Sequence, residues 1–161
     1  MNKGKYWSTE ISDCFALRGI GEGKPITQML VQKMVYFAHG LYLAETKGSP
    51  LIKEDFEAWK FGPVVPNIYH KYKIFGDTPI RDLSLLRYSG HSVEPCELIN
   101  VAYGIIEDTW KNLKDLDAIQ VSNWTHKDGS AWSRVYNPNE RNIIIPNEYI
   151  MDDFKEFIVE E

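Results

Sequence analysis

The sequence predicts a mainly α fold (α+β), a single compact helical domain over residues 1–161 with a small β element. Long apolar stripes at helical spacing support this prediction, the clearest of them between residues 27 and 45. Glycine and proline clusters separate the periodic segments, as expected for turns. The chain of 161 residues has the usual length of one domain, and its hydrophobic content of 43% supports a sizeable core.

Three helices are predicted in the first half of the chain. The first covers about residues 9–17 and precedes a glycine-rich loop at 19–25. The second, 27–45, is capped by a threonine and is apolar around most of its circumference, which is typical of a central core helix. The third covers 66–76 and begins at Pro66, whose missing N–H is tolerated in a first helical turn.

The second half is also mostly helical. Residues 77–93 read as a loop with one helical turn, and a fourth helix is expected over 94–113. Asp117 begins a short helix, with a glutamine at the capping-box position three residues later. Asn147 is expected to cap the last helix, which has an apolar inner face and an acidic outer face.

The β element is the least regular part of the pattern. Residues 55–61 alternate weakly between apolar and polar side chains, which predicts a short strand that ends at Gly62-Pro63. Residues 135–136 and 143–145 could pair as a hairpin near 133–146.

Charge and composition exclude several functional classes. The net charge is −5 and the sequence pI about 5.4, with no basic cluster, so nucleic acid is not an expected partner. Apolar runs are far shorter than a membrane span of about 20 residues. Residues 1–15 lack the apolar run of a signal peptide, so a cytoplasmic location is expected. In that reducing compartment, Cys14 and Cys96 should be buried thiols.

Motifs for catalysis are missing from the sequence. The four histidines lack the spacings of metal ligands, so neither a metal nor a cofactor is expected. Cys14 follows the inward face of its helix, and negative neighbours of Cys96 would raise the pKa of a thiol there. We therefore expect no catalytic residue and no enzyme. A small hydrolase using His126 is the remaining chemical alternative.

Two stretches are rich in aromatic side chains and turn formers, residues 59–69 and 123–132. Each is compatible with a stiff loop whose aromatics pin it to the core. Each is equally typical of a preorganised patch that receives a partner, because rigid aromatics lose little entropy on binding. Gly62-Pro63 and Pro66 make the first stretch stiff, so we expect it primarily to fix the fold and secondarily to present its aromatic side chains.

Three blocks carry a resemblance to a known family. Residues 31–38, V-Q-K-M-V-Y-F-A, resemble the family helix L-Q-K-L-L-Y-F-A. Residues 58–69 resemble its A-W-K-Y-G-P-V-V-P-x-V-Y block, and Thr125-His126 followed by Trp132 resembles its T-H-x-x-x-P-W segment. The family is the Panacea-domain group, which includes SocA-like antitoxins and phage-associated, GepA-like proteins. The resemblance extends from about residue 11 to 157, and alanine replaces the proline before Trp132.

This resemblance implies an antitoxin, encoded beside a toxin gene, that neutralises a cognate protein toxin by direct binding. At least some relatives instead deliver the toxin to a protease. The alternative is a phage or mobile-element interaction protein without a toxin partner, and exposed aromatics could also form a homo-oligomer. The expected partner-binding residues are Trp59, Lys60, Phe61, Tyr69, His126 and Trp132. The expected structural motif residues are Gln32, Lys33, Tyr36, Gly62, Pro63 and Pro66.

Overall fold

The computed structural model of the chain describes residues 4–93 and 96–158, and it confirms the mainly α fold with a small two-stranded sheet. The elements follow one another as α1 (Ser8–Gly21), α2 (Gln28–Glu45), β1 (Glu57–Trp59), β2 (Gly62–Val64), α3 (Pro66–Tyr72), the 3₁₀ turn η1 (Lys73–Phe75), α4 (Ser84–Tyr88), α5 (Asn100–Leu113), α6 (Ala118–Thr125), α7 (Ala131–Val135), α8 (Asn147–Phe154) and η2 (Lys155–Phe157).

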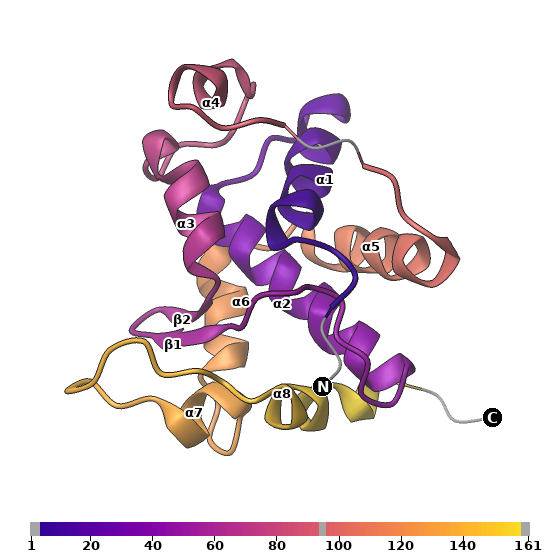
Figure 1. Ribbon diagram of the computed structural model, residues 1–161, viewed down its shortest axis with the longest axis vertical. Helices are drawn as coiled ribbons and strands as arrows, with labels where there is room; N and C mark the ends of the chain where they lie inside the picture. Colours follow the sequence, from indigo (N-terminus) through magenta and orange to yellow (C-terminus); the bar gives the residue numbers. More distant parts are fainter. Residues whose placement is uncertain (1–3, 94–95, 159–161) are drawn as a thin grey trace.

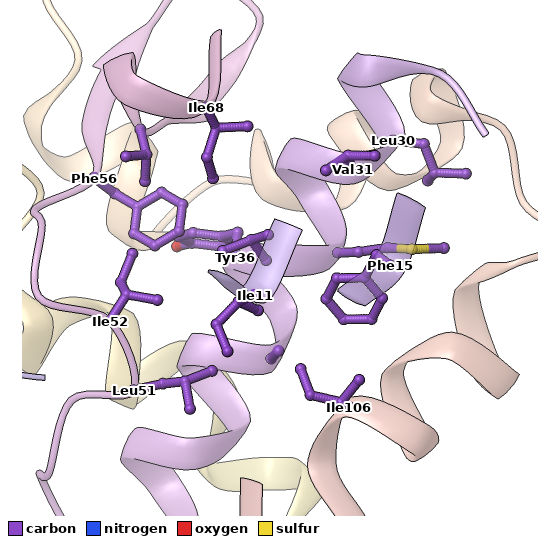
Figure 2. Close-up of a cluster of buried hydrophobic side chains, with 14 of the residues drawn as sticks. Ile11, Phe15, Leu30, Val31, Tyr36, Leu51, Ile52, Phe56, Ile68 and Ile106 are labelled. Carbon is purple, nitrogen blue, oxygen red and sulfur yellow. The ribbon is translucent and has the colours of Figure 1, made fainter. Parts of the chain in front are cut away.

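Helix α2 lies at the centre, and α1, α3, α5, α6, α8 and β2 all pack against it (Figure 1). Its predicted start is confirmed, because the Thr27 hydroxyl accepts a hydrogen bond from the Leu30 N–H at 3.3 Å. Figure 2 shows buried side chains from several elements converging on this helix. Tyr36 is fully buried there, edge-on to the rings of Phe56 and Phe154 at 5.1 and 5.7 Å. Tyr36 thus joins α2 to the chain before β1 and to α8 through ring contacts.

Helix α1 is longer than the sequence predicts. It extends through Gly19 to Gly21, where a loop was expected, and both glycines are helical. A Cβ at Gly19 would lie 2.7 Å from the carbonyl oxygen of Lys24. Glycine is therefore used here for a close approach of the following chain, not to end the helix.

The expected β element is present, but part of its pairing was predicted wrongly. Strand β1 pairs with β2 in an antiparallel hairpin, with Glu57 opposite Val64. Residues 143–145 are extended, yet they pair with β1 through hydrogen bonds from Ala58 N to Ile143 O and from Ile145 N to Phe56 O, both 2.8 Å. The hairpin expected near 133–146 does not form, because residues 131–135 are helix α7.

Helix α8 also differs slightly from its predicted start. Pro146 occupies the N-cap position, and Asn147 is the first helical residue. The Asn147 carbonyl Oδ1 lies 2.9 Å from Nε2 of the buried His39, so this side chain joins α8 to α2 instead of capping its own helix. Gly40 in α2 allows the Phe154 ring to approach, because a Cβ there would collide with the ring.

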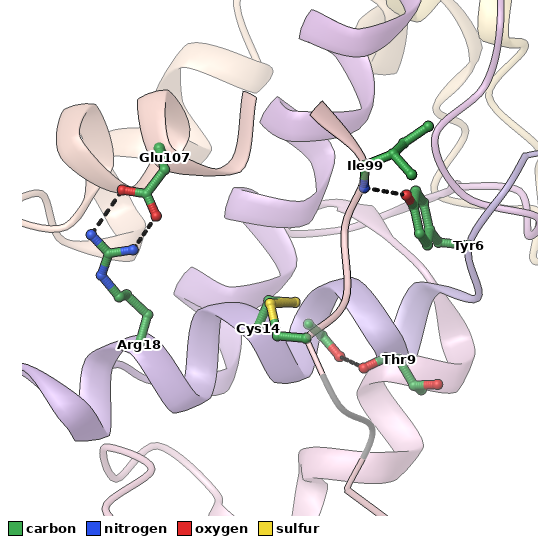
Figure 3. The surroundings of a disulfide bond; sticks show 8 residues. Tyr6, Thr9, Cys14, Arg18, Ile99 and Glu107 are labelled. Atoms are coloured by element: carbon green, nitrogen blue, oxygen red, sulfur yellow. Dashed lines mark hydrogen bonds and ion pairs between the residues drawn. A yellow bond between two sulfur atoms is a disulfide. The ribbon is translucent and has the colours of Figure 1, made fainter. Parts of the chain in front are cut away.

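The two cysteines are not thiols, which corrects the prediction. Cys14 and Cys96 form a disulfide, with their Cα atoms 5.2 Å apart, inside the usual range for such bonds (Figure 3). Helix α5 was expected to begin near residue 94 but begins at Asn100. Residues 96–99 run non-helically past α1, and the Ile99 N–H donates to the Tyr6 hydroxyl at 3.1 Å. The bond and this contact explain the later start of the helix.

Across residues 4–93 and 96–158, none of the helices combines the length and the apolar character needed to cross a membrane.

Candidate partner-binding groove

An apolar groove of about 690 Å³ lies between α2, α6 and the corner made by β1, β2 and α3. Its lining residues are Thr27, Gln28, Met29, Gln32, Lys33, Trp59, Lys60, Phe61, Val64, Tyr69, Gly76, Asp77, Asp117, Ala118 and Ile119. The groove is open to solvent, because Phe61 is 60% exposed and Ile119 is 68% exposed.

Gly62, Pro63 and Pro66 shape the corner beside the groove. Gly62 has a φ of +116°, a conformation that L side chains rarely adopt, and a Cβ there would collide with the Lys33 ammonium. Pro63 lies in β2, and Pro66 is the first residue of α3. These three residues restrict the backbone conformation between the hairpin and α3.

Two side chains of α2 tie this corner to the core. The Gln32 amide donates to the Val65 carbonyl at 3.0 Å and accepts from the Val65 N–H at 3.1 Å. Lys33 Nζ donates to the carbonyl oxygens of Phe61 and Pro63 at 2.9 and 3.3 Å. Gln32 and Lys33 therefore hydrogen-bond the backbone of residues 61, 63 and 65 from α2.

Lys33 is a buried amine at the base of the groove. It is 1% exposed, and its hydrogen-bond acceptors are two neutral carbonyls, without an ion pair to a carboxylate among the described residues. Burial lowers the pKa of the ammonium to about 7.

This burial predicts an unusual pH dependence of stability. The folded pKa of Lys33 is about 7 and the ordinary value is 10.5. Between these values the unfolded chain binds more protons, so the contribution of Lys33 to the free energy of unfolding rises with pH, by up to about 1.4 kcal/mol per unit. Urea unfolding of wild type and Lys33→Met at pH 7 to 10 measures this pH-dependent contribution to the free energy of unfolding. If the difference between the two proteins stays constant over that range, Lys33 is not a desolvated amine.

The groove brings together four of the residues expected to bind a partner. Trp59, Lys60, Phe61 and Tyr69 all line it. The Trp59 and Tyr69 rings pack edge to face at 5.2 Å, and Lys60 Nζ lies 5.5 Å from the centre of the Phe61 ring. Phe61 is the most exposed of the three aromatic side chains.

The other two expected residues lie behind the hairpin, outside the groove lining. Trp132 donates its indole N–H to the Trp59 carbonyl at 2.7 Å and stacks on Tyr136 at 4.4 Å. The His126 ring packs on Trp132 at 4.0 Å. Burial lowers the pKa of His126, and the nearby positive charge of Lys33 adds to that shift. Trp132 therefore contacts the hairpin directly, whereas His126 packs on Trp132.

Sequence reasoning missed the opposite wall of the groove. Met29 on α2 and Ile119 on α6 are exposed apolar side chains, and Asp77 and Asp117 also line the groove. The sequence alone did not mark Ile119, because two of the three buried positions of α6 are polar. The buried positions of α6 are Val121, Ser122 and Thr125, so an isoleucine outside that face is a large apolar residue left in solvent.

Among the described residues, no three histidine, cysteine or carboxylate side chains are grouped so that they could hold a metal ion.

Comparison with known proteins places the chain in a family. The family described as Antitoxin SocA-like, Panacea domain, matches residues 31–133, more than half of the chain. The chain belongs to this family. A curated relative, Antitoxin SocA of Caulobacter vibrioides (strain NA1000 / CB15N), is 34% identical over 117 residues, which cover 70% of this chain and 61% of the relative. The match thus spans less than two thirds of that relative's length. No solved structure matches the chain.

The part of this chain that matches the SocA-like, Panacea-domain family contains most of the groove. Only Thr27, Gln28 and Met29 of the lining residues fall before residue 31. The hairpin corner and its two tethers, Gln32 and Lys33, lie inside the matched range. Most of the residues that build the groove therefore lie in the part of this chain that matches the family.

Proposed function

We propose that this protein is an antitoxin that neutralises a cognate protein toxin by direct binding, with the apolar groove as the contact surface. The observation that supports this most is the groove itself. It is preformed, it is lined by exposed apolar side chains, and it is built almost wholly from the segment that matches an antitoxin family. Such surfaces are typical of protein-binding sites.

The residues of the groove have unequal roles in binding the toxin. Phe61 and Ile119, on opposite walls, are the main anchors, because they expose large apolar surfaces. Trp59 and Tyr69 form the floor on the hairpin side. His126 and Trp132 act indirectly by supporting the hairpin, and no catalytic role is assigned to any residue.

Co-purification with the product of the neighbouring gene tests this function. The double variant Phe61→Ala/Ile119→Ala should weaken binding by about 100-fold, the usual scale for two anchors at a protein interface, and should leave cells unprotected from the toxin. The matched control is Tyr88→Ala/Tyr103→Ala, since these exposed aromatics lie outside the groove lining. A partner held equally well by both double variants would place the interface elsewhere. A neighbouring product that is neither bound nor toxic would favour the phage-associated interaction protein.

Blocking a toxin and delivering it to a protease both need this binding step. The two mechanisms differ in the half-life of the bound toxin in cells. A half-life that shortens when the antitoxin is present, and recovers in Phe61→Ala/Ile119→Ala, supports delivery, whereas an unchanged half-life with full protection supports blocking.

A further inference from the structure

The hairpin edge that faces the groove is already hydrogen-bonded. Lys33 and Gln32 occupy the outward carbonyls of Phe61 and Pro63 and both polar groups of the Val65 backbone, and proline at 63 offers no N–H. On the β1 side, the extended segment before α8 pairs with the strand. A partner that adds a strand needs a row of unpaired donors and acceptors. The described hairpin leaves no such row, so the groove recognises side chains.

The groove walls suit the side chains of a helix. Met29, Phe61 and Ile119 project from three different elements, α2, the hairpin and α6, and all three are exposed. An amphipathic helix presents apolar side chains at i, i+3 or i+4, and i+7 on one face, which is the usual way to fill a groove of this kind.

The groove has two distinguishable ends, because α2 and α6 run in the same direction along it. Lys33 and Ser122 both donate to the Phe61 carbonyl at 2.9 Å, so these positions of the two helices are level. Further along both helices, the Phe37 and Trp124 rings pack 4.7 Å apart. The two helices therefore run in the same general direction (Figure 1). Their N-terminal ends mark the same end of the groove that both helices line.

That end is acidic. Asp117 caps α6, and Asp77 lies beside the first turn of α2, because Gln28 donates to the carbonyl of the preceding Gly76 at 2.7 Å. Both carboxylates are exposed, and neither has an ion pair within residues 4–93 and 96–158. Beside Phe61, away from that end, lies instead the exposed ammonium of Lys60. The charge of the groove is therefore asymmetric along its length.

We propose that the groove binds an amphipathic helix of the partner, oriented so that a lysine or arginine at one end of the helix meets Asp77 and Asp117. This inference rests on the proposed function for the identity of the partner, but not for the chemistry of the contact. Opposite charges at the open end of an apolar groove mainly set orientation and specificity. The net charge of −5 further favours a basic partner segment.

The test is a selection of random 16-residue peptides on the immobilised full-length protein, followed by affinity measurement of the enriched sequences at low and physiological salt. We expect apolar residues at helical spacing with a lysine or arginine at one end. Binding should be lost in Phe61→Ala/Ile119→Ala and should weaken with salt.

The charge contact has its own variant. Asp77→Asn/Asp117→Asn removes both charges while asparagine keeps the cap of α6. It should bind the selected peptides about tenfold more weakly, the scale of two partly exposed ion pairs. The control Asp108→Asn/Glu97→Gln changes the net charge equally at exposed positions outside the groove lining and should bind like wild type.

Several outcomes would overturn the inference. The selected peptides could have apolar residues in strict alternation, or acidic residues at their ends. They could bind Asp77→Asn/Asp117→Asn and Asp108→Asn/Glu97→Gln equally weakly, or the selection could enrich no peptide whose binding depends on the groove. Failure of the antitoxin function gives a different result, since helical, basic-ended peptides would still be selected while the neighbouring gene product is not bound.

Discussion

Asp13→Ala is expected to lower the free energy of unfolding by about 3–5 kcal/mol, because it leaves the Lys71 ammonium buried without its counter-ion. Lys71 Nζ lies 2.6 Å from Asp13 Oδ2, and the two side chains are 3% and 0% exposed. The carboxylate also accepts a hydrogen bond from the Tyr72 hydroxyl. Burial first, and then the Asp13 charge, raise the pKa of that phenol well above its ordinary value.

Loss of this pair is expected to affect the groove as well as stability. Asp13 belongs to α1, whereas Lys71 belongs to α3, the helix that carries Tyr69. Lys71 also donates to the Ser92 carbonyl at 2.9 Å, so the chain after α4 contacts the same ammonium. The pair therefore joins three segments that are far apart in sequence.

Urea unfolding at pH 7 measures the effect, with Asp115→Ala as the control. Asp115 pairs with Lys24 at the surface, where an ion pair contributes about 1 kcal/mol or less. The double variant Asp13→Leu/Lys71→Met should recover much of the lost stability, because it removes both buried charges together. Equal losses in Asp13→Ala and Asp115→Ala would mean that the core pair is not desolvated.

Local signals in the sequence predicted most helices well. Thr27 caps α2 and Asp117 caps α6, because each cap depends on residues three positions away. Pro66 begins α3 for an equally local reason. The start of α5 was wrong because its first turn is displaced by a disulfide and by Tyr6, which lies 93 positions before Ile99.

Long-range pairing could not be read from local patterns. Residues 143–145 were recognised as extended, but their partner is β1 and not the nearby segment at 135–136. The cysteines were assigned as thiols from the expected compartment, because no pattern in the sequence shows that Cys14 and Cys96 meet.

The candidate site was also predicted in part. One wall of the groove comes from a single compact stretch around Phe61, which its aromatic content made visible. The other wall is supplied by Met29 and Ile119 from distant helices, and only the packing of α6 beside α2 brings them together. The buried donor Lys33 belonged to the predicted structural motif, but its contact with the Phe61 and Pro63 carbonyls required the folded chain.

Reduction of the Cys14–Cys96 disulfide is expected to lower the free energy of unfolding by about 4 kcal/mol. The two cysteines are separated by 82 residues, so the bond removes much conformational entropy from the unfolded chain. A loss of this size is a large share of the stability of a typical domain, about 5–15 kcal/mol. In a reducing compartment the protein would have only the free energy of unfolding that remains without the disulfide.

The native structure should nevertheless persist without the bond. Helix α5 stays attached to α1 by the bidentate contact between Arg18 and Glu107 (Figure 3). Trp110 of α5 is also buried in the core. The segment before α5 keeps its hydrogen bond from Ile99 to Tyr6. The cysteines line none of the groove, so reduction should change stability and not the binding surface.

Urea unfolding with and without a phosphine reductant, with mass spectrometry to count thiols, separates these effects. Wild type should lose stability on reduction, whereas Cys14→Ser/Cys96→Ser should already have the lower value and not respond. Binding that depends on Phe61 should be the same in both proteins while they remain folded. A wild type that forms the bond yet unfolds identically in both states would contradict the loop-entropy argument. Loss of binding on reduction in a folded protein would show instead that the disulfide controls the groove from a distance.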